Sequence, residues 1–285
     1  MPRKTFRLTE PAVMTAPVIV SSPHSGRDYE WDFLTSSVLD SERIRSSEDA
    51  YVDILLERVP ALGVPLLAAE MPRAFLDLNR APEELDPAVI RDLPRGQTNP
   101  RINSGLGVIP RVVAQGRAIY EGKISHREAR QRIDRVWRPY HAQLQELMDI
   151  AHRRFGQAIL LDMHSMPHEA IEATGPQGST PEVVLGDRFG VSAAPDLVDR
   201  VEAVFTELGF RVARNTPFAG AYITQTYGRP AEARHAVQIE IDRALYLDEA
   251  RVQPSRAFDE MQDRLTEAVA RICAEVTGLR DMAAE

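Results

Sequence analysis

The sequence predicts an α/β protein, built as a parallel or mixed β-sheet with helices on both of its faces. Short apolar runs typical of buried strands alternate along the chain with longer segments whose apolar residues recur at helical spacing. Strands separated by helices in this way favour a sheet layered between helices. The chain has 285 residues, of which 44% are hydrophobic and 27% charged, so it is long enough to bury a sizeable core.

The positions of the individual elements follow from these patterns. Apolar runs predict strands at residues 18–22, 64–69, 74–78, 159–162, 211–214 and 236–242. Helical spacing predicts helices at residues 49–59, 125–155, 195–208 and 257–279. Ser125 and Glu128 have the spacing of a capping box at the start of the second helix. Pro139 should kink or split that helix.

The domain organisation is expected to be simple. We expect one domain over residues 1–285, with a loop-rich insertion around residues 81–120. That insertion is rich in Pro, Gly and Asn and has weak periodicity. Long loops in compact domains are often functional lids, so the insertion is a candidate for a role near the active site.

Composition and charge exclude several classes of function. The net charge of −8 leaves no basic footprint for nucleic acid. No run approaches the ~20 apolar residues of a membrane span, and no signal peptide is recognisable, so we expect a cytoplasmic protein. Cys273 is the single cysteine, which excludes an internal disulfide and a zinc site of the CxxC type. The expected partner is therefore a small molecule, and the expected assembly a monomer or homodimer.

Two histidines follow apolar strands in nearly the same way. His24 ends the string Pro17-Val-Ile-Val-Ser-Ser-Pro-His, His164 ends the string Ala158-Ile-Leu-Leu-Asp-Met-His, and each is followed by Ser. Ligands of open α/β sheets bind beyond the carboxyl ends of strands. Either histidine alone could be structural, but two of them at such strand ends indicate two ligands of one metal, and hence a hydrolase. Catalytic zinc typically takes three protein ligands, His together with a carboxylate, and keeps one position open.

The third ligand should be acidic, and two neighbours compete for the role. Glu48 and Asp49 follow the polar stretch at 43–47 and open a predicted helix. A helix cap with acids placed against the helix dipole accounts for these residue types equally well. The spacing of the residues leaves both interpretations open.

A carboxylate in the strand at 236–242 suggests a general base. Glu240 lies in the string Val-Gln-Ile-Glu-Ile, which is mostly β-branched and apolar and is therefore typical of an inner strand. An exposed edge strand could hold such an acid without a function. In an inner strand a base acting on a metal-activated water gives a reason for it.

Other polar residues are candidates for substrate binding. Asn79 and Arg80 end the segment Phe75-Leu-Asp-Leu-Asn-Arg; Arg suits bidentate binding of a carboxylate, and Asn can donate to an oxyanion. A surface salt bridge is the alternative for Arg80. The loops at 103–111 and 215–230 are rich in small and polar residues, and either could be only a connector.

In combination these strings resemble the N-formylglutamate amidohydrolase family. The resemblance covers residues 17 to about 249 and rests on the order of seven short strings. They are Ser22-Pro-His-Ser-Gly26, Asp49-Ala-Tyr-Val-Asp53, Asp77-Leu-Asn-Arg80, Gly105-Leu-Gly-Val-Ile-Pro-Arg111, Asp162-Met-His-Ser-Met-Pro167, Gly220-Ala-Tyr-Ile-Thr224 and Ala236-Val-Gln-Ile-Glu240. The family is similar to zinc carboxypeptidases and aspartoacylase-like deacylases. This implies a three-layer α/β/α sandwich with a central mixed, mostly parallel sheet, as in zinc exopeptidases and the phosphorylase/hydrolase-like proteins.

The resemblance also implies roles for the candidate residues. His24, Asp49 and His164 would be the metal ligands, with Glu48 second to Asp49. Zn²⁺ is the expected metal, and another divalent metal is the alternative. Glu240 would be the catalytic base. The residues implied to bind substrate are Asn79, Arg80, Arg111, Gly220, Tyr222 and Thr224.

The implied reaction is hydrolysis of the amide bond of an N-acyl amino acid. N-formyl-L-glutamate, cleaved to formate and L-glutamate as in histidine degradation, is the leading substrate. The alternatives are a zinc carboxypeptidase-like or other N-acyl-amino-acid deacylase and, in another class, a catalytically silent small-molecule binding protein. Gln225 stands where relatives often have Arg. We therefore expect a weaker demand for an acidic side chain on the substrate, unless another residue such as Arg111 binds that carboxylate.

Overall fold

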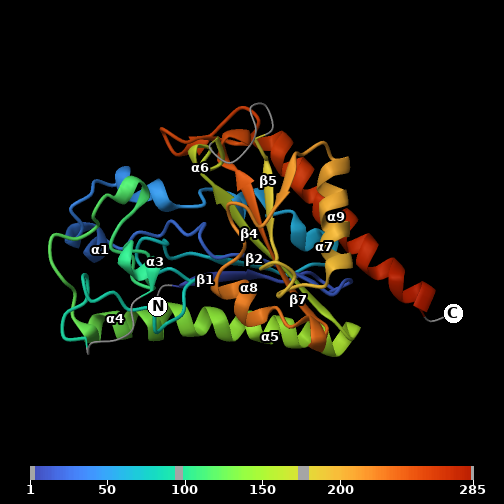
Figure 1. The fold of residues 1–285 in the computed structure, drawn as a ribbon, viewed down its shortest axis with the longest axis horizontal. Helices are drawn as coiled ribbons and strands as arrows, with labels where there is room; N and C mark the ends of the chain where they lie inside the picture. Colours follow the sequence, from blue (N-terminus) through green and yellow to red (C-terminus); the bar gives the residue numbers. More distant parts are fainter. Residues whose placement is uncertain (1–3, 94–98, 173–179, 284–285) are drawn as a thin grey trace. The chain divides into compact units, whose positions relative to one another are not determined.

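A seven-stranded mixed sheet is the central element of the computed structural model, which describes residues 4–93, 99–172 and 180–283. The order of its strands is β1-β3-β2-β4-β7-β5-β6 (Figure 1). Their bounds are β1 Phe6–Thr9, β2 Val18–Ser22, β3 Leu66–Ala69, β4 Ala158–Met166, β5 Val183–Gly186, β6 Val212–Arg214 and β7 Arg234–Asp242. A separate two-stranded ribbon pairs β8 (Leu247–Asp248) with β9 (Gln253–Pro254).

The middle of the sheet is parallel. β4 runs parallel to both β2 and β7, and β5 runs parallel to β6 but antiparallel to β7. β2 and β4 are buried at every position, and β7 at every position after Arg234. Strands covered on both faces need apolar residues on both faces, which is why they read as continuous apolar runs in the sequence. The predicted fold class, a helix-covered and mostly parallel mixed sheet, is confirmed.

Helices of very different lengths connect these strands. The α-helices are α1 Trp31–Ser36, α2 Val52–Leu55, α3 Pro100–Asn103, α4 His126–Arg132, α5 Arg138–Phe155, α6 Glu169–Glu172, α7 Pro195–Glu207, α8 Tyr222–Tyr227 and α9 Phe258–Ala283. The 3₁₀ turns are η1 Arg43–Ser47, η2 Val59–Leu62, η3 Ala114–Gly116, η5 Pro230–Glu232 and η6 Arg243–Leu245. No helix of the described residues is long and apolar enough to cross a membrane.

Two compact units can be distinguished by their internal contacts. The first comprises the residues up to Arg7 together with Pro23–Ala50 and Ala68–Gln143. In its core the guanidinium of Arg132 stacks over the ring of Phe75, 4.2 Å from the ring centroid, and donates to the Tyr120 hydroxyl. This packing encloses a cation between aromatic side chains.

The second unit comprises Leu8–Ser22, Tyr51–Leu67 and the chain from Leu144 onward. Here α8 packs on β4 and β7, while α7 packs against β5, β6 and α9, and α9 also contacts α2 (Figure 1). Helices therefore cover both faces of this part of the sheet. That the chain works as one domain stays a prediction.

Two predicted elements are wrong in type or length. The predicted strand at 74–78 consists of turns and irregular chain. Phe75 N–H donates to Pro72 O within a turn, and Asp77 N–H donates to the distant Val108 O. The apolar side chains of this segment are buried all the same, so burial rather than pairing explains the apolar run. The helix predicted at 49–59 is reduced to α2 and η2, because Tyr51 has a left-handed backbone conformation (φ 63°) where the helix should begin.

Pro139 interrupts its helix as expected. A single π-helical turn, η4 (Ile133–Trp137), lies between α4 and α5, and Pro139 occupies the first turn of α5. Proline lacks an N–H and its ring clashes with the preceding turn, and a widened turn accommodates both effects. In the described residues of 81–120 the helical turns are α3 and η3, while residues 94–98 lie outside the described part. That this segment is an insertion stays a prediction.

Candidate metal centre and active site

His24 follows β2 and is oriented by a buried aspartate. Its Nε2–H donates to Oδ1 of Asp77 across 2.7 Å, and both side chains are 2% exposed. Burial alone would raise the pKa of the Asp77 carboxyl. The neighbouring His24, Arg73 and Arg80 outweigh that effect and hold the pKa well below its usual range. Asp77 is therefore an anion that fixes the ring so that Nδ1 is the nitrogen available to a ligand.

His164 is oriented in a similar way from the neighbouring strand. Its Nε2–H donates to Oδ2 of Asp162 across 3.0 Å, and the other oxygen of Asp162 accepts a hydrogen bond of 2.6 Å from the Ser21 hydroxyl on β2. Asp162 and His164 are two residues apart on β4, so they project from the same face of the sheet. Both side chains are almost completely buried.

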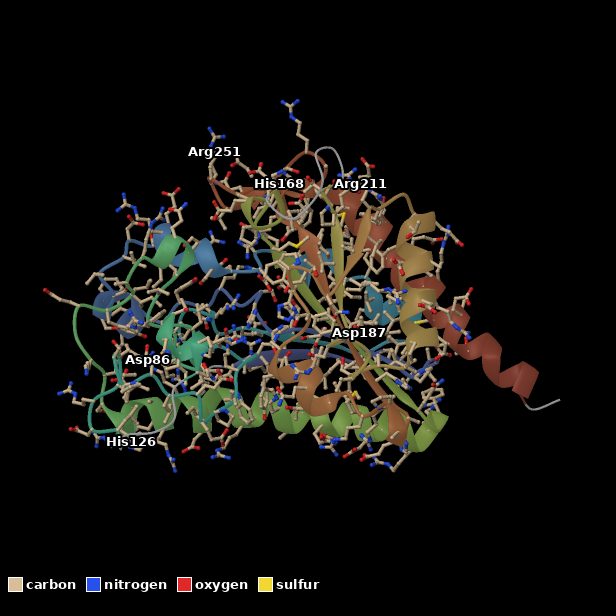
Figure 2. The ribbon with its side chains drawn as sticks, in the orientation of Figure 1. Asp86, His126, His168, Asp187, Arg211 and Arg251 are labelled. Carbon is tan, nitrogen blue, oxygen red and sulfur yellow. The ribbon has the colours of Figure 1, made fainter. Side chains whose placement is uncertain are left out.

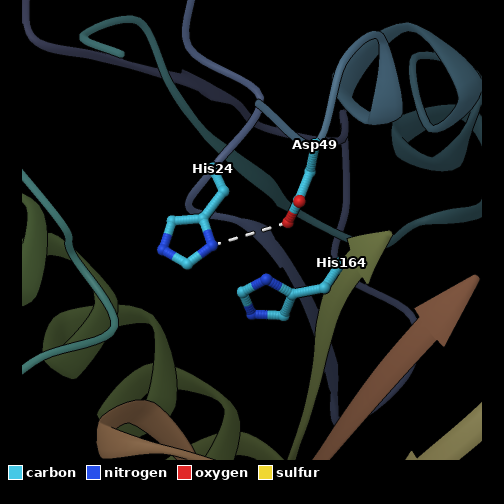
Figure 3. Close-up of side chains that lie close together, drawn as sticks. All are labelled: His24, Asp49 and His164. Carbon is cyan, nitrogen blue, oxygen red and sulfur yellow. Dashed lines mark ion pairs between the residues drawn. The ribbon is translucent and has the colours of Figure 1, made fainter. Parts of the chain in front are cut away.

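The two histidines meet the carboxylate of Asp49. One ligand atom from each of His24, Asp49 and His164 lies within 4.8 Å of the other two, and all three residues are buried (Figure 3). Nδ1 of His24 is 3.5 Å from Oδ2 of Asp49, and the N–H of Asp49 donates to the His24 carbonyl oxygen. The structure thus brings together the three predicted ligands.

Glu48, the alternative acidic ligand, is occupied elsewhere. Its carboxylate accepts hydrogen bonds from Nε and Nη2 of Arg45, at 3.0 and 3.1 Å, and from the Tyr29 hydroxyl at 2.7 Å. Burial, followed by the charge of Glu48, raises the pKa of Tyr29, so this hydroxyl remains a donor. Glu48 therefore anchors its own turn, and its neighbour Asp49 is the acid near the histidines.

Glu240 lies directly beside His164 in the sheet. The parallel register of β4 and β7 pairs His164 with Glu240 and Asp162 with Gln238. Paired residues on neighbouring strands project from the same face, at the interstrand spacing of about 4.8 Å. Oε1 of Glu240 accepts a hydrogen bond of 2.8 Å from the Gln238 amide, and the glutamate is 8% exposed. The prediction that β7 is an inner strand with a buried carboxylate is confirmed.

Asn79 and Arg80 continue from the aspartate that holds His24. The N–H of Asn79 donates to Oδ1 of Asp77 at 2.8 Å, so one carboxylate oxygen fixes both the His24 ring and the backbone of this turn. Arg80 donates to the carbonyls of Leu106 and Asn79, and Trp137 donates to the Arg80 carbonyl. Burial lowers the pKa of the Arg80 guanidinium, with Asp77 opposing. Arg80 is 7% exposed and is not the surface ion pair considered as an alternative.

Arg111 has partners of its own. Its Nε donates to Oδ2 of Asp86 at 3.0 Å, and its Nη2 donates to the Asn103 carbonyl at 3.1 Å. Asp86, labelled in Figure 2, is buried, and the N–H of Ala88 also donates to it. These contacts explain Arg111 as a residue that fixes the loop-rich insertion, and its role in substrate binding stays a prediction.

The loop before α8 is shaped by a glycine. Gly220 has φ +101°, and a Cβ at this position would lie 2.5 Å from Oγ1 of Thr224. Thr224 is fully buried and donates its hydroxyl to the Ala221 carbonyl. Tyr222 is the first residue of α8 and is partly buried, whereas Gln225 is exposed. Only glycine fits the bend that brings the loop against Thr224.

Two residues that support the histidines were not singled out from the sequence. Asp77 and Asp162 each accept the Nε2–H of one histidine. A signal existed for Asp162, because Asp-x-His on a strand places both side chains on one face. No comparable signal existed for Asp77, which is 53 residues from His24.

The donor set fits a divalent transition metal. Two imidazoles and one carboxylate are the ligands typical of catalytic zinc. A carboxylate behind each ligating histidine is a common feature of such centres and fixes the tautomer that ligates. The three residues predicted as ligands are the ones whose ligand atoms lie within 4.8 Å of one another, a spacing at which they could hold one ion.

Comparison with known proteins places this site in a family. The profile of the N-formylglutamate amidohydrolase family matches residues 16–247. An N-formylglutamate deformylase of Pseudomonas putida is 31% identical over 240 residues, which are 82% of each chain. A second, from Pseudomonas aeruginosa, is 31% identical over 236 residues, covering 82% of this chain and 83% of the relative.

Solved structures agree with the sequence comparison. The crystal structure of N-formylglutamate amidohydrolase from Ralstonia eutropha JMP134 superposes with a TM-score of 0.89 at 39% identity, covering 96% of this chain and 98% of that one. A protein from Agrobacterium tumefaciens shares the fold at a TM-score of 0.68 and 14% identity, covering 98% of this chain and 97% of that one. The chain is a hydrolase that acts on a non-peptide amide bond. It belongs to the N-formylglutamate amidohydrolase family.

Proposed function

We propose that this protein hydrolyses N-formyl-L-glutamate to formate and L-glutamate in a metal-dependent reaction. The observation that carries the proposal is the buried group of His24, Asp49 and His164, with Glu240 paired to His164 in the sheet. The deformylases that match most of the chain support the choice of substrate. We further propose that the enzyme acts in histidine degradation and that it does so in the cytoplasm.

The metal is proposed to be zinc, held by His24, Asp49 and His164. Imidazole and carboxylate ligands suit zinc among the common divalent ions. Such an ion would supply Lewis acidity and lower the pKa of a water molecule to near neutrality. Asp77 and Asp162 contribute by holding the Nε2–H of each histidine, which leaves Nδ1 to face the ion.

Glu240 is proposed to move the proton. Its carboxylate would accept a proton from the water that attacks the formyl carbon, and then deliver it to the amide nitrogen as the C–N bond breaks. The oxygen of the water ends in formate, and the nitrogen leaves as the amino group of glutamate. The hydrogen bond from Gln238 to Oε1 orients the Glu240 carboxylate, which is proposed to take the proton.

Asn79 and Arg80 are proposed to bind the substrate. An arginine fork pairs with the α-carboxylate by two parallel hydrogen bonds, which lysine cannot reproduce. Asn79 could donate to the developing oxyanion. Both residues follow Asp77, so the same anion that orients His24 also fixes the backbone of the proposed substrate-binding turn.

A direct test uses the purified protein with N-formyl-L-glutamate. We expect formate and glutamate in equal amounts, loss of activity after the metal is removed with a chelator, and recovery on addition of one equivalent of zinc. N-acetyl-L-glutamate and a C-terminal glutamyl dipeptide serve as competing substrates. Faster turnover of either would indicate another N-acyl-amino-acid deacylase or a carboxypeptidase-like enzyme. Binding of N-formylglutamate without turnover, at full zinc occupancy, would indicate a silent binding protein.

A further inference from the structure

The substrate of the proposed function has two carboxylates, and a second cation is needed for the one on its side chain. Gln225, in α8, is uncharged and exposed in this chain. Arg111 is paired with Asp86 and the Asn103 carbonyl. A different arginine should therefore provide the positive charge.

Arg188 is an arginine of the second unit whose guanidinium has no hydrogen-bond or ion-pair partner among the described residues. Its Nε is buried. The other partly or fully buried arginines of this unit donate to carboxylates, carbonyls or hydroxyls of the described chain. They are Arg200, Arg214, Arg234, Arg243 and Arg264. A guanidinium half withdrawn from water without an acceptor is destabilising, unless a ligand supplies the acceptor.

The backbone around Arg188 is strained and firmly held. Arg188 and Phe189 both have left-handed conformations, with φ of 54° and 57°, which non-glycine residues rarely adopt. Asn215 fixes this turn, because its amide donates to Asp187 at 2.6 Å and its oxygen accepts from the N–H groups of Asp187 and Phe189. The N–H of Arg188 donates to the Ala219 carbonyl. Strain that is supported from several sides at one residue is typical of a functional position.

The side chain of Arg188 lies against the loop that precedes α8. Its Cγ is 3.2 Å from where a Cβ of Gly220 would lie, and Oγ1 of Thr224 is 2.5 Å from the same point. α8 packs on β4 and β7, the strands of His164 and Glu240. Within α8, the pKa of Tyr227 is raised by burial, by Tyr222 and by the charge of Asp162, which places this helix over the polar face of the sheet. Arg188 is thus connected to the proposed active site through Gly220 and Thr224.

The sheet register shows on which side of Glu240 the turn with Arg188 lies. β5 runs antiparallel to β7, with Val184 opposite Glu240 and Gly186 opposite Gln238. The chain therefore moves from the level of the proposed base toward the amino end of β7 before it reaches Asp187 and Arg188. Figure 2 shows Asp187 on this side of the sheet, away from His168 beyond the end of β4. A substrate whose amide lies at the level of Glu240 can extend its side chain in this direction.

We propose that Arg188 binds the side-chain carboxylate of the substrate and gives the enzyme its preference for N-formyl amino acids with an acidic side chain. The proposal rests on the proposed function. It assigns to the turn after β5 the charge that Gln225 does not supply, and so replaces the weaker demand for an acidic side chain expected from the sequence. Arg188 is a specificity-determining residue, because it contacts the part of the substrate that does not react.

The test compares N-formyl-L-glutamate with N-formyl-L-glutamine, which has the same shape without the charge. We expect the wild type to prefer the glutamate substrate in kcat/KM, and Arg188→Gln to lower kcat/KM for it by about 10- to 100-fold, the range for a charged hydrogen bond. The value for the glutamine substrate should change less than about threefold. Arg188→Lys should retain part of the preference. Arg211→Gln is the control, because Arg211 is an exposed arginine of the same unit paired with Glu182.

The possible outcomes separate this inference from the proposed function. An equal loss of kcat/KM on both substrates would overturn the inference and make Arg188 a structural residue. Values for both substrates that equal those of the wild type would exclude Arg188 from substrate binding. A wild type that turns over neither substrate would contradict the proposed function instead. In that case calorimetry decides on Arg188: L-glutamate should bind the wild type and the Arg211→Gln control about tenfold or more tightly than Arg188→Gln. Equal affinities would overturn the inference without reference to turnover.

Discussion

The two histidines of the candidate metal centre are oriented by the same kind of contact, reached in two different ways. His164 and its partner Asp162 are two residues apart on one buried strand, and Ser21 on the next strand holds the other oxygen of the aspartate. His24 and its partner Asp77 are 53 residues apart, and Asp77 lies in irregular chain between two turns rather than in a strand. Both contacts leave Nδ1 of the histidine on the side away from the carboxylate.

The difference shows how much support each ligand needs. On β4 the alternation of side chains along the strand fixes the geometry of Asp162 and His164 with little further help. Asp77 has no strand to position it, and its charge is held instead by Arg73, at 3.0 Å, by the N–H of Asn79 and by the His24 ring. A position outside the strands therefore requires a larger set of polar contacts than the same position in a sheet.

The largest expected effect is that of replacing either histidine, and it should be the same for both. His24→Ala and His164→Ala should each abolish zinc binding and activity while the fold is retained, because two of three protein ligands cannot hold a catalytic zinc tightly. Metal content by mass spectrometry and circular dichroism of the purified variants test this. If one variant kept near-normal zinc content and turnover, that histidine would not be a ligand and the comparison would fail.

A somewhat smaller effect is expected for the residue that lies beside one histidine only. Glu240→Gln should lower kcat by about 10² to 10⁴ while the zinc content is unchanged, because glutamine has nearly the same shape and cannot accept a proton. Steady-state kinetics measure kcat, and metal analysis measures the zinc content of the same preparation. A rate within a few-fold of the wild type would remove Glu240 from the proposed mechanism.

The two supporting aspartates should differ from each other. Removing such a partner typically costs 10- to 100-fold in metal affinity. We expect Asp77→Asn to lie near the upper end of this range, since it leaves Arg73 and Arg80 as unbalanced positive charges near His24. Asp162→Asn should lie near the lower end, since Ser21 can still hydrogen bond to the amide. Competition with a chromophoric chelator measures the zinc affinity of both variants. The opposite ranking would show that zinc binding depends more on the aspartate in the strand, Asp162, than on Asp77.

The sequence was sufficient for the parts of the site that lie on strands. β2, β4 and β7 are buried on both faces, so their apolar runs were visible, and His164 and Glu240 could be placed on them. Asp49 could be separated from Glu48 only through the resemblance to the family. The structure gives the physical reason for the difference: Glu48 is held by Arg45 and Tyr29, and the spacing of residues does not reveal these contacts.

The parts that depend on turns could not be predicted. The apolar residues at 74–78 have the composition of a strand, but their backbone groups bond to Pro72 and Val108 and form no ladder. β5 has four residues and was not recognised, although it leads directly to Arg188. The left-handed conformations of residues such as Tyr51 and Arg188 depend on contacts with residues distant in the sequence, and a local sequence pattern does not reveal these contacts.

The smallest expected effect concerns the end of β4 beyond His164. Nδ1 of His168 is 2.7 Å from Oδ2 of Asp242, and this hydrogen bond raises the pKa of the histidine above 6.5. A raised pKa stabilises the folded protein below pH 6.5, and this contribution is lost as the pH rises through the folded-state pKa. The side chain is 40% exposed, so we expect less than about 1 kcal/mol.

Urea unfolding measures this contribution. His168→Gln should lower the free energy of unfolding more at pH 5.5 than at pH 8.5. The same difference at both pH values would show that the charge of His168 does not contribute, and that the end of β4 is held by its neutral hydrogen bonds.

The central claim is that one metal ion contacts His24, Asp49 and His164, each histidine through the nitrogen opposite its aspartate. The anomalous difference density of zinc in a crystal of the zinc-loaded enzyme tests it most directly. We predict one strong peak in contact with Nδ1 of His24, Nδ1 of His164 and the carboxylate of Asp49, with Glu48 still bound to Arg45. A peak in contact with Nε2 of either histidine or with Glu48, or a peak that lies away from these residues, would contradict the account.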